Sequence, residues 1–163
     1  MIDSTDRQIL NILQQNARTS NAEIARQIDM APSAIFERIR KLEERGVLAG
    51  YEARVSPRAV GLGLVAFIFV RAEDRAGGTT TGTRLAEVPE VLEVHHIAGE
   101  DCYLVKVRTA DTESLGVLLR DGIGSIPAVH STRTTIVLGT VKESTRLPLG
   151  VPAVSEEEEP LHV

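Results

Sequence analysis

The stretch SNAEIARQIDMAPSAIFERIRKLEER, Ser20 to Arg45, decides how the first part of the chain folds. Its apolar residues recur at helical spacing in two short runs, which Asp29-Met30-Ala31 separates. The first run begins at Ser20 with Glu23 three residues later, the sequence signature of a capped helix start. The second begins at Pro32, which suits a first helical position because its missing N–H costs no hydrogen bond there. The stretch therefore predicts two helices joined by a tight turn.

The second of these helices is basic on its outer face. Its apolar stripe is expected to be Ile35, Ile39 and Leu42. A second helix that enters the DNA major groove is the arrangement of a helix-turn-helix. The residues off the stripe are then the candidates for DNA contact, namely Ser33, Ala34, Glu37, Arg38, Lys41 and Arg45. We interpret the stretch as a DNA-binding head, and a pair of such heads predicts a palindromic operator on double-stranded DNA.

The candidate contact residues differ in chemistry. Arg38 fits a bidentate contact to guanine, whereas Lys41 and Arg45 suit phosphates, which position a protein without specifying sequence. Ser20 and Asn21, at the start of the preceding helix, can offer backbone N–H groups to a phosphate. Phe36 is ambiguous between core packing and groove contact, and packing is the expectation.

The flanking patterns complete this first domain. A helix is expected from about Ser4 to Gln15, with Asp3 as its N-cap. Gly46 is expected to end the basic helix in the left-handed conformation. Tyr51 to Ser56 has the pattern of a short strand, a candidate wing. The predicted DNA-binding domain therefore covers residues 1–50, and a wing strand and hinge follow at 51–61.

The run from Leu62 to Val70 changes the character of the chain. A half-buried strand alternates in polarity, and this run does not, so both faces of the strand need cover. The domain's own helices can cover one face. The other face needs a partner, and we expect a second copy of the sheet to cover it. The remaining pattern predicts a helix at 82–88, strands at 91–98 and 102–108, a helix capped by Asp111, and a strand at 130–141.

This order, β-α-β-β-α-β, is the ferredoxin-like split unit. The predicted fold class is therefore α+β, a winged helix-turn-helix followed by a ferredoxin-like domain at residues 62–141. Residues 142–163 contain three prolines and the run Glu156–Glu159. That composition predicts an acidic, mobile tail.

Bulk composition narrows the class of protein. The 163 residues are 42% hydrophobic and 25% charged, as in an ordinary globular protein. The single cysteine excludes an internal disulfide, no apolar run has the length of a membrane span, and no signal-peptide pattern opens the sequence. We expect a cytoplasmic protein with no membrane partner. The net charge is −5, but residues 1–61 carry +1, whereas 62–141 and 142–163 each carry −3.

The chain resembles the Lrp/AsnC (leucine-responsive, feast/famine) transcriptional regulators. The matching segments, which span about residues 2–146, are Asp6–Leu10, Asn16–Arg18, Glu23–Ala25, Phe36–Leu48, Gly50-Tyr51, Gly99–Val107 and Thr132–Thr134. The resemblance implies a winged helix-turn-helix joined to a ligand-binding αβ domain. It also implies dimers that assemble into octamers and control by a free amino acid. No cofactor is predicted.

An amino acid brings one carboxylate and one ammonium group, and two segments have the chemistry to meet them. In the turn Gly99-Glu100-Asp101, backbone amides can form an anion nest and Asp101 can pair with the ammonium. Thr132 and Thr134 alternate on the last strand, so both hydroxyls point to one face. The resemblance implies that these two segments line an effector pocket where dimers meet. Arg133 points the other way and is expected at an interface.

Other functions remain open at this point. His95, His96, Cys102 and His130 suggest a metal, but their spacing supports no known site, so none is predicted. An architectural DNA-binding protein without an effector is one alternative. A tetrapyrrole decarboxylase is another, because sirohaem decarboxylases resemble this fold. No nucleophile triad or carboxylate pair is evident, and the chain is expected not to be an enzyme.

Overall fold

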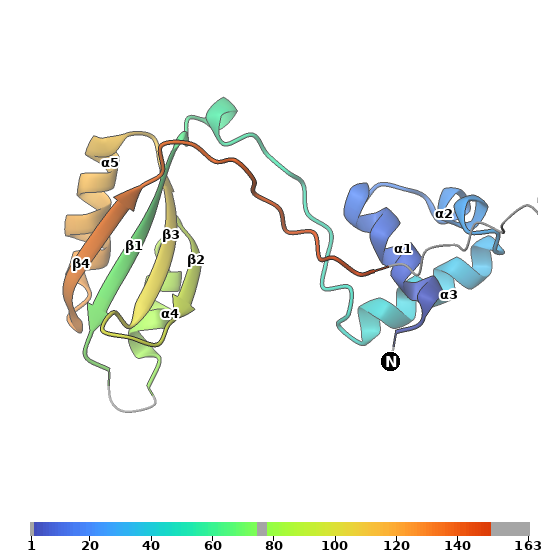
Figure 1. Ribbon diagram of the computed structural model, residues 1–163, viewed down its shortest axis with the longest axis horizontal. Coiled ribbons are helices and arrows are strands. Elements are labelled where there is room, and N and C mark those ends of the chain that lie inside the picture. Colours follow the sequence, from blue (N-terminus) through green and yellow to red (C-terminus); the bar gives the residue numbers. More distant parts are fainter. Residues whose placement is uncertain (1, 75–77, 151–163) are drawn as a thin grey trace, which may run out of the picture. The chain divides into compact units, whose positions relative to one another are not determined.

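A computed structural model describes residues 2–74 and 78–150. The chain forms two compact units. Met1–Arg54, together with the segment from Ser144 onward, makes the first unit, and Val55–Glu143 makes the second. The first is helical, and the second is a sheet with helices (Figure 1).

The first unit contains three helices, α1 (Ser4–Gln15), α2 (Asn21–Gln27) and α3 (Pro32–Glu44). Each buries one apolar stripe, so the three enclose a core of Ile9, Leu10, Leu13, Ile24, Ala25, Ile35, Ile39 and Leu42. Asp3 caps α1 as expected, since its carboxylate accepts from the backbone N–H of Asp6 at 2.8 Å. Asp6 returns the bond to the backbone N–H of Asp3, so a full capping box fixes the helix start.

The helix-turn-helix itself is close to the prediction. The Ser20 hydroxyl accepts from the Glu23 N–H at 3.2 Å, but the Glu23 carboxylate bonds Arg26 instead of completing a capping box. The N-cap of α3 is Ala31, which provides no side-chain hydrogen bond. After α3, Gly46 adopts a φ of 66°, the left-handed conformation expected of it.

The expected wing strand is absent. Residues 51–56 are extended and exposed, but they pair with no strand among the described residues. A single extended segment cannot form a hydrogen-bonded ladder without a neighbour, so the strand-like composition is not enough. The segment leads to one 3₁₀ turn, Arg58–Val60, before the sheet begins.

The C-terminal segment attaches to α1. The guanidinium Nη1 of Arg7 donates to the Leu149 carbonyl at 2.7 Å, and Gln14 exchanges two hydrogen bonds with the backbone of Leu147. The Leu149 side chain packs against the core of the first unit. Residues 144–150 are therefore bound to the helical unit. They form part of the tail, 142–163, expected to be mobile, and the acidic run of that tail, Glu156–Glu159, lies outside the described residues.

The second unit has the expected β-α-β-β-α-β order. Its elements are β1 (Leu64–Ala72), α4 (Thr80–Ala86), β2 (Val91–His96), β3 (Tyr103–Thr109), α5 (Thr112–Val117), a π-helical turn (Leu118–Gly122), a 3₁₀ turn (Ile123–Ser125) and β4 (Val129–Ile136). The strands form one antiparallel sheet in the order β2-β3-β1-β4. The expected last strand ends five residues early, at Ile136, which pairs with Ala66; one further backbone hydrogen bond joins Val137 to Val65 at 2.9 Å.

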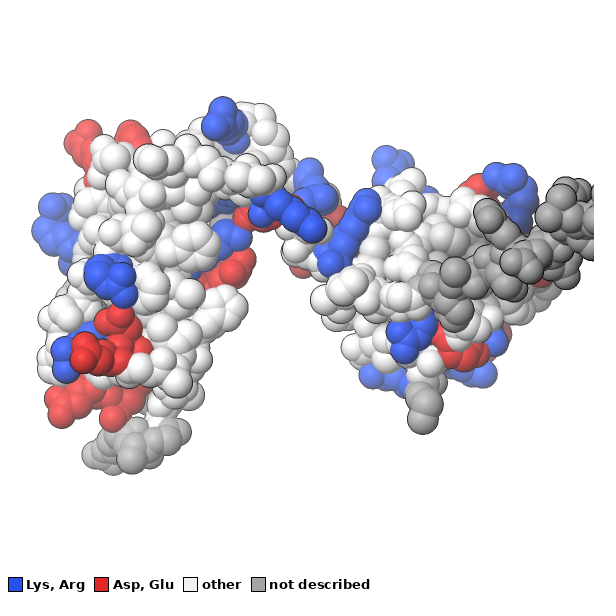
Figure 2. Space-filling view, in the orientation of Figure 1, with Lys and Arg blue, Asp and Glu red and all other residues white. Residues whose placement is uncertain are grey.

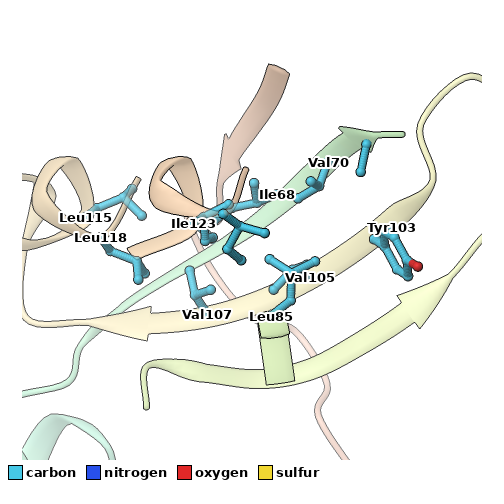
Figure 3. Close-up of a cluster of buried hydrophobic side chains, with 12 residues drawn as sticks. Ile68, Val70, Leu85, Tyr103, Val105, Val107, Leu115, Leu118 and Ile123 are labelled. Atoms are coloured by element: carbon cyan, nitrogen blue, oxygen red, sulfur yellow. The ribbon is translucent and has the colours of Figure 1, made fainter. Parts of the chain in front are cut away.

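The core of this unit lies on one side of the sheet. Ile68 and Val70 of β1 and Val105 and Val107 of β3 are fully buried. Leu85 of α4 and three apolar residues of the α5 region cover them (Figure 3). Figure 1 shows α4 and α5 on the same side of the sheet. The opposite face carries Phe67 and Phe69, which are only half-buried. Within the described residues, no helix has the length and apolar character required to cross a bilayer.

Candidate DNA-binding face and effector region

The outer face of α3 displays most of the residues that the sequence nominated. Ser33, Glu37, Lys41 and Arg45 are exposed, and Ala34 and Arg38 are half-buried. A hollow of about 330 Å³ lies along this face, lined by Asp6, Ala34, Glu37, Arg38, Lys41, Leu42 and Arg45. The stripe of Ile35, Ile39 and Leu42 points into the core, which fixes the direction of the outer face.

Arg38 is already engaged within the unit. Its Nη1 donates to the Asp6 carboxylate at 2.7 Å and to the Asp3 carboxylate at 2.8 Å. Hydrogen bonds first with Asp3 and then with Asp6 raise the pKa of Arg38. Arg38 therefore ties α3 to the start of α1. That it reads a base remains a prediction, and this ion pair competes with such a contact.

The other charges on α3 fall into two groups. Arg40 bonds Glu37 and Glu44 on its own helix, so these three neutralise one another in part. Lys41 and Arg45 form no ion pair with any described residue. On the face drawn in Figure 2, basic and acidic side chains are interspersed on both units. The two unpaired cations are thus the side chains of α3 best suited to phosphate.

Two further predictions concern α2 and Phe36. Ser20 is the N-cap of α2 and Asn21 its first residue, so the backbone N–H of Asn21 has no partner within the helix. Phe36, expected to pack, is 55% exposed, which overturns that expectation. Ile35 is buried, and the next residue of an α-helix points in a different direction, so Phe36 lies on the outer side of α3 near the polar residues. The sequence offered no signal for this, since Phe is a common core residue.

The hairpin turn between β2 and β3 holds the first candidate effector segment. Gly99 has a φ of 137°, a backbone conformation that favours glycine, and Glu100 is exposed. Asp101 has a partner on the sheet, because its Oδ2 accepts a hydrogen bond from Nη2 of Arg133 at 3.0 Å. The Arg133 guanidinium also lies over the Phe69 ring, 4.0 Å from its centre.

One chain does not bring the two candidate effector segments together. Thr132 pairs with Val70 and Thr134 with Ile68, so both threonines share the helix-covered side of the sheet. Arg133 pairs with Phe69 on the opposite side, as expected, and Asp101 joins it there. Strand β1 also lies between β3 and β4, which puts the turn and the threonines about 10 Å apart in strand spacing alone.

A second polar cluster, which the sequence did not suggest, lies at the same end of the sheet. The carboxylate of Asp74 accepts from the Tyr103 hydroxyl at 2.6 Å and from the Thr81 hydroxyl at 2.7 Å. These hydrogen bonds, first that of Tyr103, lower the pKa of Asp74. The His96 ring stacks on Tyr103 with centroids 5.1 Å apart. The cluster fastens α4 to the sheet beside the turn.

The remaining candidates do not converge on one site. His95 contacts Glu93 and His130 contacts Glu73, while His96 stacks on Tyr103. In the described ranges, no three His, Cys, Asp or Glu side chains are grouped so as to hold a metal ion. A shallow cavity of about 850 Å³ lies on the helical side between α4 and α5, with Arg84, Glu87 and Asp121 on its rim, away from the candidate effector residues.

Both units match known domain families. Residues 2–49 match the family model described as winged helix-turn-helix DNA-binding, and residues 65–147 match that of the Lrp/AsnC ligand binding domain. The HTH-type transcriptional regulator FL11 of Pyrococcus horikoshii is 42% identical over 149 residues, 91% of this chain and 97% of that protein. The leucine-responsive regulatory protein of Escherichia coli is 33% identical over 148 residues, 90% of each chain.

Solved structures agree with this. A transcriptional regulator of Neisseria meningitidis in complex with L-Met has a TM-score of 0.85 at 32% identity, over 91% of this chain and 97% of that one. The feast or famine regulatory protein of Mycobacterium tuberculosis complexed with L-methionine has a TM-score of 0.83 at 34% identity, over 90% and 99%. The chain therefore belongs to the Lrp/AsnC family of DNA-binding transcriptional regulators.

Proposed function

We propose that the protein binds a palindromic operator as a symmetric dimer and that a free amino acid changes this binding. The observation that carries the DNA claim is the outer face of α3 in a helix-turn-helix, where Lys41 and Arg45 are exposed and have no ion-pair partner among the described residues. In this proposal Lys41 and Arg45 contact phosphates, with the N-terminus of α2 at Ser20 and Asn21. Ser33, Ala34, Glu37 and Arg38 face the bases. Because the partner is DNA, we expect the protein in the cytoplasm.

Pairing is supported by the open face of the sheet. Phe67 and Phe69 are half-buried there, and Lys106 and Arg108 on the same face bind Glu143. Apolar residues that follow β4 lack cover as well, since Leu138 and Val141 are fully exposed. Apolar surface of this kind favours association. A palindromic operator would require the two α3 helices of such a dimer to bind half-sites about 34 Å apart, one turn of DNA. We propose that such dimers assemble further, to octamers.

Effector control is supported by the two related regulators whose structures hold L-Met or L-methionine. We propose that Gly99, Glu100 and Asp101 bind the amino acid together with Thr132 and Thr134 of another copy, since the two segments of one chain lie on different faces. Asp101 would then exchange its bond with Arg133 for one with the ligand's ammonium group. We propose a regulatory role with no catalytic activity of its own.

A thermal-shift screen of the free amino acids tests the effector. A ligand selective for the folded state raises apparent stability by mass action. We expect one or a few amino acids to raise the melting temperature and to change affinity for operator DNA, and Asp101→Ala to abolish both effects. If no amino acid does either, an architectural DNA-binding protein is the better description. A tetrapyrrole that is bound and decarboxylated would instead favour the enzyme.

The DNA claim is tested separately with Lys41→Ala. Loss of one phosphate contact should weaken operator and random duplex alike and reduce the slope of log affinity against log salt by about 1. A loss of affinity for the operator alone would show that Lys41 reads sequence. Unchanged affinity for both would remove α3 from the interface.

A further inference from the structure

The capping box at the start of α1 also holds Arg38 of α3. Oδ1 of Asp3 accepts from the backbone N–H of Asp6 at 2.8 Å, and Oδ2 of Asp6 accepts from the backbone N–H of Asp3 at 3.2 Å. The other oxygen of each carboxylate, Oδ2 of Asp3 and Oδ1 of Asp6, accepts from Nη1 of Arg38, at 2.8 and 2.7 Å. Every oxygen of the two carboxylates is therefore engaged. Asp3 and Asp6 together form a guanidinium clamp around Nη1.

The guanidinium clamp uses only one nitrogen of Arg38. Nη1 has one hydrogen for each carboxylate, so both of its N–H groups are occupied. Nη2 and Nε bond no described residue. The clamp therefore excludes any DNA contact that requires Nη1, but it leaves the edge formed by Nε and Nη2. The N–H groups of that edge form a planar fork, which matches the paired acceptors O6 and N7 of guanine.

This open edge belongs to a side chain that reaches the outer face of α3. Arg38 is 32% exposed, and it lines the hollow on that face together with Glu37, Lys41 and Arg45. The Glu37 carboxylate is bound by Arg40 at 3.0 Å, so it does not occupy Nε or Nη2 of Arg38. The fork is thus free to meet an acceptor on a ligand that enters the hollow.

The clamp also changes which acceptor Arg38 prefers. One guanidinium (+1) and two carboxylates (−2) give the cluster a net charge of −1, whereas Lys41 and Arg45 have no ion-pair partner among the described residues. This cluster repels a phosphate, but a base edge is neutral and is recognised by directional hydrogen bonds. A guanidinium that is already held in one orientation also loses less rotamer entropy on binding. Clamped Arg38 is therefore a poor ligand for phosphate and a well-oriented one for a base.

We propose that Asp3 and Asp6 are positioning residues that make Arg38 selective for guanine over phosphate, with Nε and Nη2 of Arg38 as the contact edge. The proposal rests on the DNA-binding role proposed for α3 and adds what sets its specificity. Lys41 and Arg45 supply affinity that is independent of sequence, and Arg38 supplies discrimination between sequences. Opening the clamp turns Arg38 into one more cation available to phosphate.

Asp3→Asn opens the clamp without removing the helix cap, because Asn caps a helix start as well as Asp does. Fluorescence anisotropy compares a duplex that the native chain selects from a random library with a duplex of scrambled sequence. At about 50 mM salt we expect Asp3→Asn to bind the scrambled duplex about threefold to fivefold more tightly, with a slope of log affinity against log salt steeper by up to about 1. The affinity ratio of selected to scrambled duplex should fall by at least about threefold. Glu52→Gln removes an exposed charge from the same unit and should leave the ratio unchanged.

Replacing single guanines of the selected duplex by 7-deazaguanine, which lacks the N7 acceptor, identifies the base. For the native chain, we expect one position in each half-site to cost at least about fivefold in affinity. Arg38→Lys keeps a cation beside Asp6 but lacks the planar fork, so the same replacement should cost less than about twofold. Equal costs in both proteins at every position, or an unchanged affinity ratio in Asp3→Asn, would overturn the proposal while the DNA-binding role stands. A native chain that selects no duplex would reject that role and the proposal together.

Discussion

Arg38 and Asp6 join the recognition helix to the first helix, with Nη1 of Arg38 2.7 Å from Oδ1 of Asp6. The Asp6 side chain is only 10% exposed. Its carboxylate also accepts a hydrogen bond from the backbone N–H of Asp3, as part of the capping box at the start of α1. A carboxylate in this position depends on its cation. The orientation of α3 is therefore set partly by a charged group that sequence alone assigns to DNA.

Replacing Arg38 by Ala should destabilise the helical unit as well as weaken DNA binding. The change leaves the buried Asp6 carboxylate without its cation, which we expect to cost about 1–3 kcal/mol in the free energy of unfolding. Arg40→Ala, on the same helix but with exposed partners, should have a much smaller effect on the free energy of unfolding than Arg38→Ala. Urea unfolding of both variants measures this. A double-mutant cycle with Asp6→Asn isolates the pair, and additive effects would show that the two residues are not coupled.

Phe36→Ala should lower DNA affinity without lowering stability. The side chain is 55% exposed on α3, so truncation opens no cavity. Ile35→Ala is the buried neighbour and should cost about 2–5 kcal/mol through cavity formation. Thermal unfolding and fluorescence anisotropy, run on both variants, separate the two roles. A large stability loss for Phe36→Ala would mean that the ring packs against something in solution, such as a second copy.

Two helical glycines should respond in opposite directions to alanine. A Cβ at Gly82 in α4 would lie 2.8 Å from the Tyr103 ring, which is 2% exposed and held through its hydroxyl by Asp74. Gly82→Ala should therefore destabilise by about 1–3 kcal/mol. A Cβ at Gly116 in α5 meets nothing within 4 Å, and Gly116→Ala should stabilise by about 0.4–1 kcal/mol. Two variants of the same sign would contradict this account.

The parts of the fold that depend on local pattern were predictable from the sequence. The 3.6-residue spacing located α1, α2 and α3, Asp3 was identified as a cap and Gly46 as a left-handed helix end. The β-α-β-β-α-β order followed from alternating strand and helix signals. In each case the interacting residues are neighbours in sequence, so propensity and side-chain spacing carry the information.

The parts that depend on distant partners were not predictable. Arg38 and Asp6 are 32 positions apart, and each has an ordinary surface-charge identity. The Arg133 side chain binds Asp101 on one face of the sheet. Thr132 lies on the other face, so the turn that contains Asp101 and this threonine are apart. The segment 51–56 has strand composition but lacks a neighbour. The spacing of residue types along the sequence does not show which distant side chain a residue will contact. These long-range contacts determine the geometry of both candidate sites.

Introducing a charge on the open face of the sheet should prevent pairing. Phe69→Glu puts a carboxylate where the proposed dimer buries an aromatic ring, and it also removes the ring beneath Arg133. We expect a smaller species in sedimentation velocity and a loss of operator affinity of at least about 100-fold, because paired heads bind one duplex together. Ser125→Glu, exposed on the helical side, is the control and should change neither. An unchanged sedimentation coefficient for Phe69→Glu would place the dimer contact elsewhere.

Acidification should weaken the second unit through Asp74. Hydrogen bonds from Tyr103 and then Thr81 lower the pKa of this carboxyl below its ordinary value of 3.8. A group with a depressed folded-state pKa stabilises the fold above its unfolded pKa, and this contribution is lost as pH falls through the folded value. The stability advantage of the native chain over Asp74→Asn should therefore be constant near neutral pH and shrink below about pH 4.

Tyr103→Phe keeps the carboxylate but removes its strongest partner, so its unfolding free energy should depend less on pH over the same range. Chemical unfolding monitored at a series of pH values measures both, and an advantage that grows on acidification would mean that the protonated carboxyl is the form the cluster prefers.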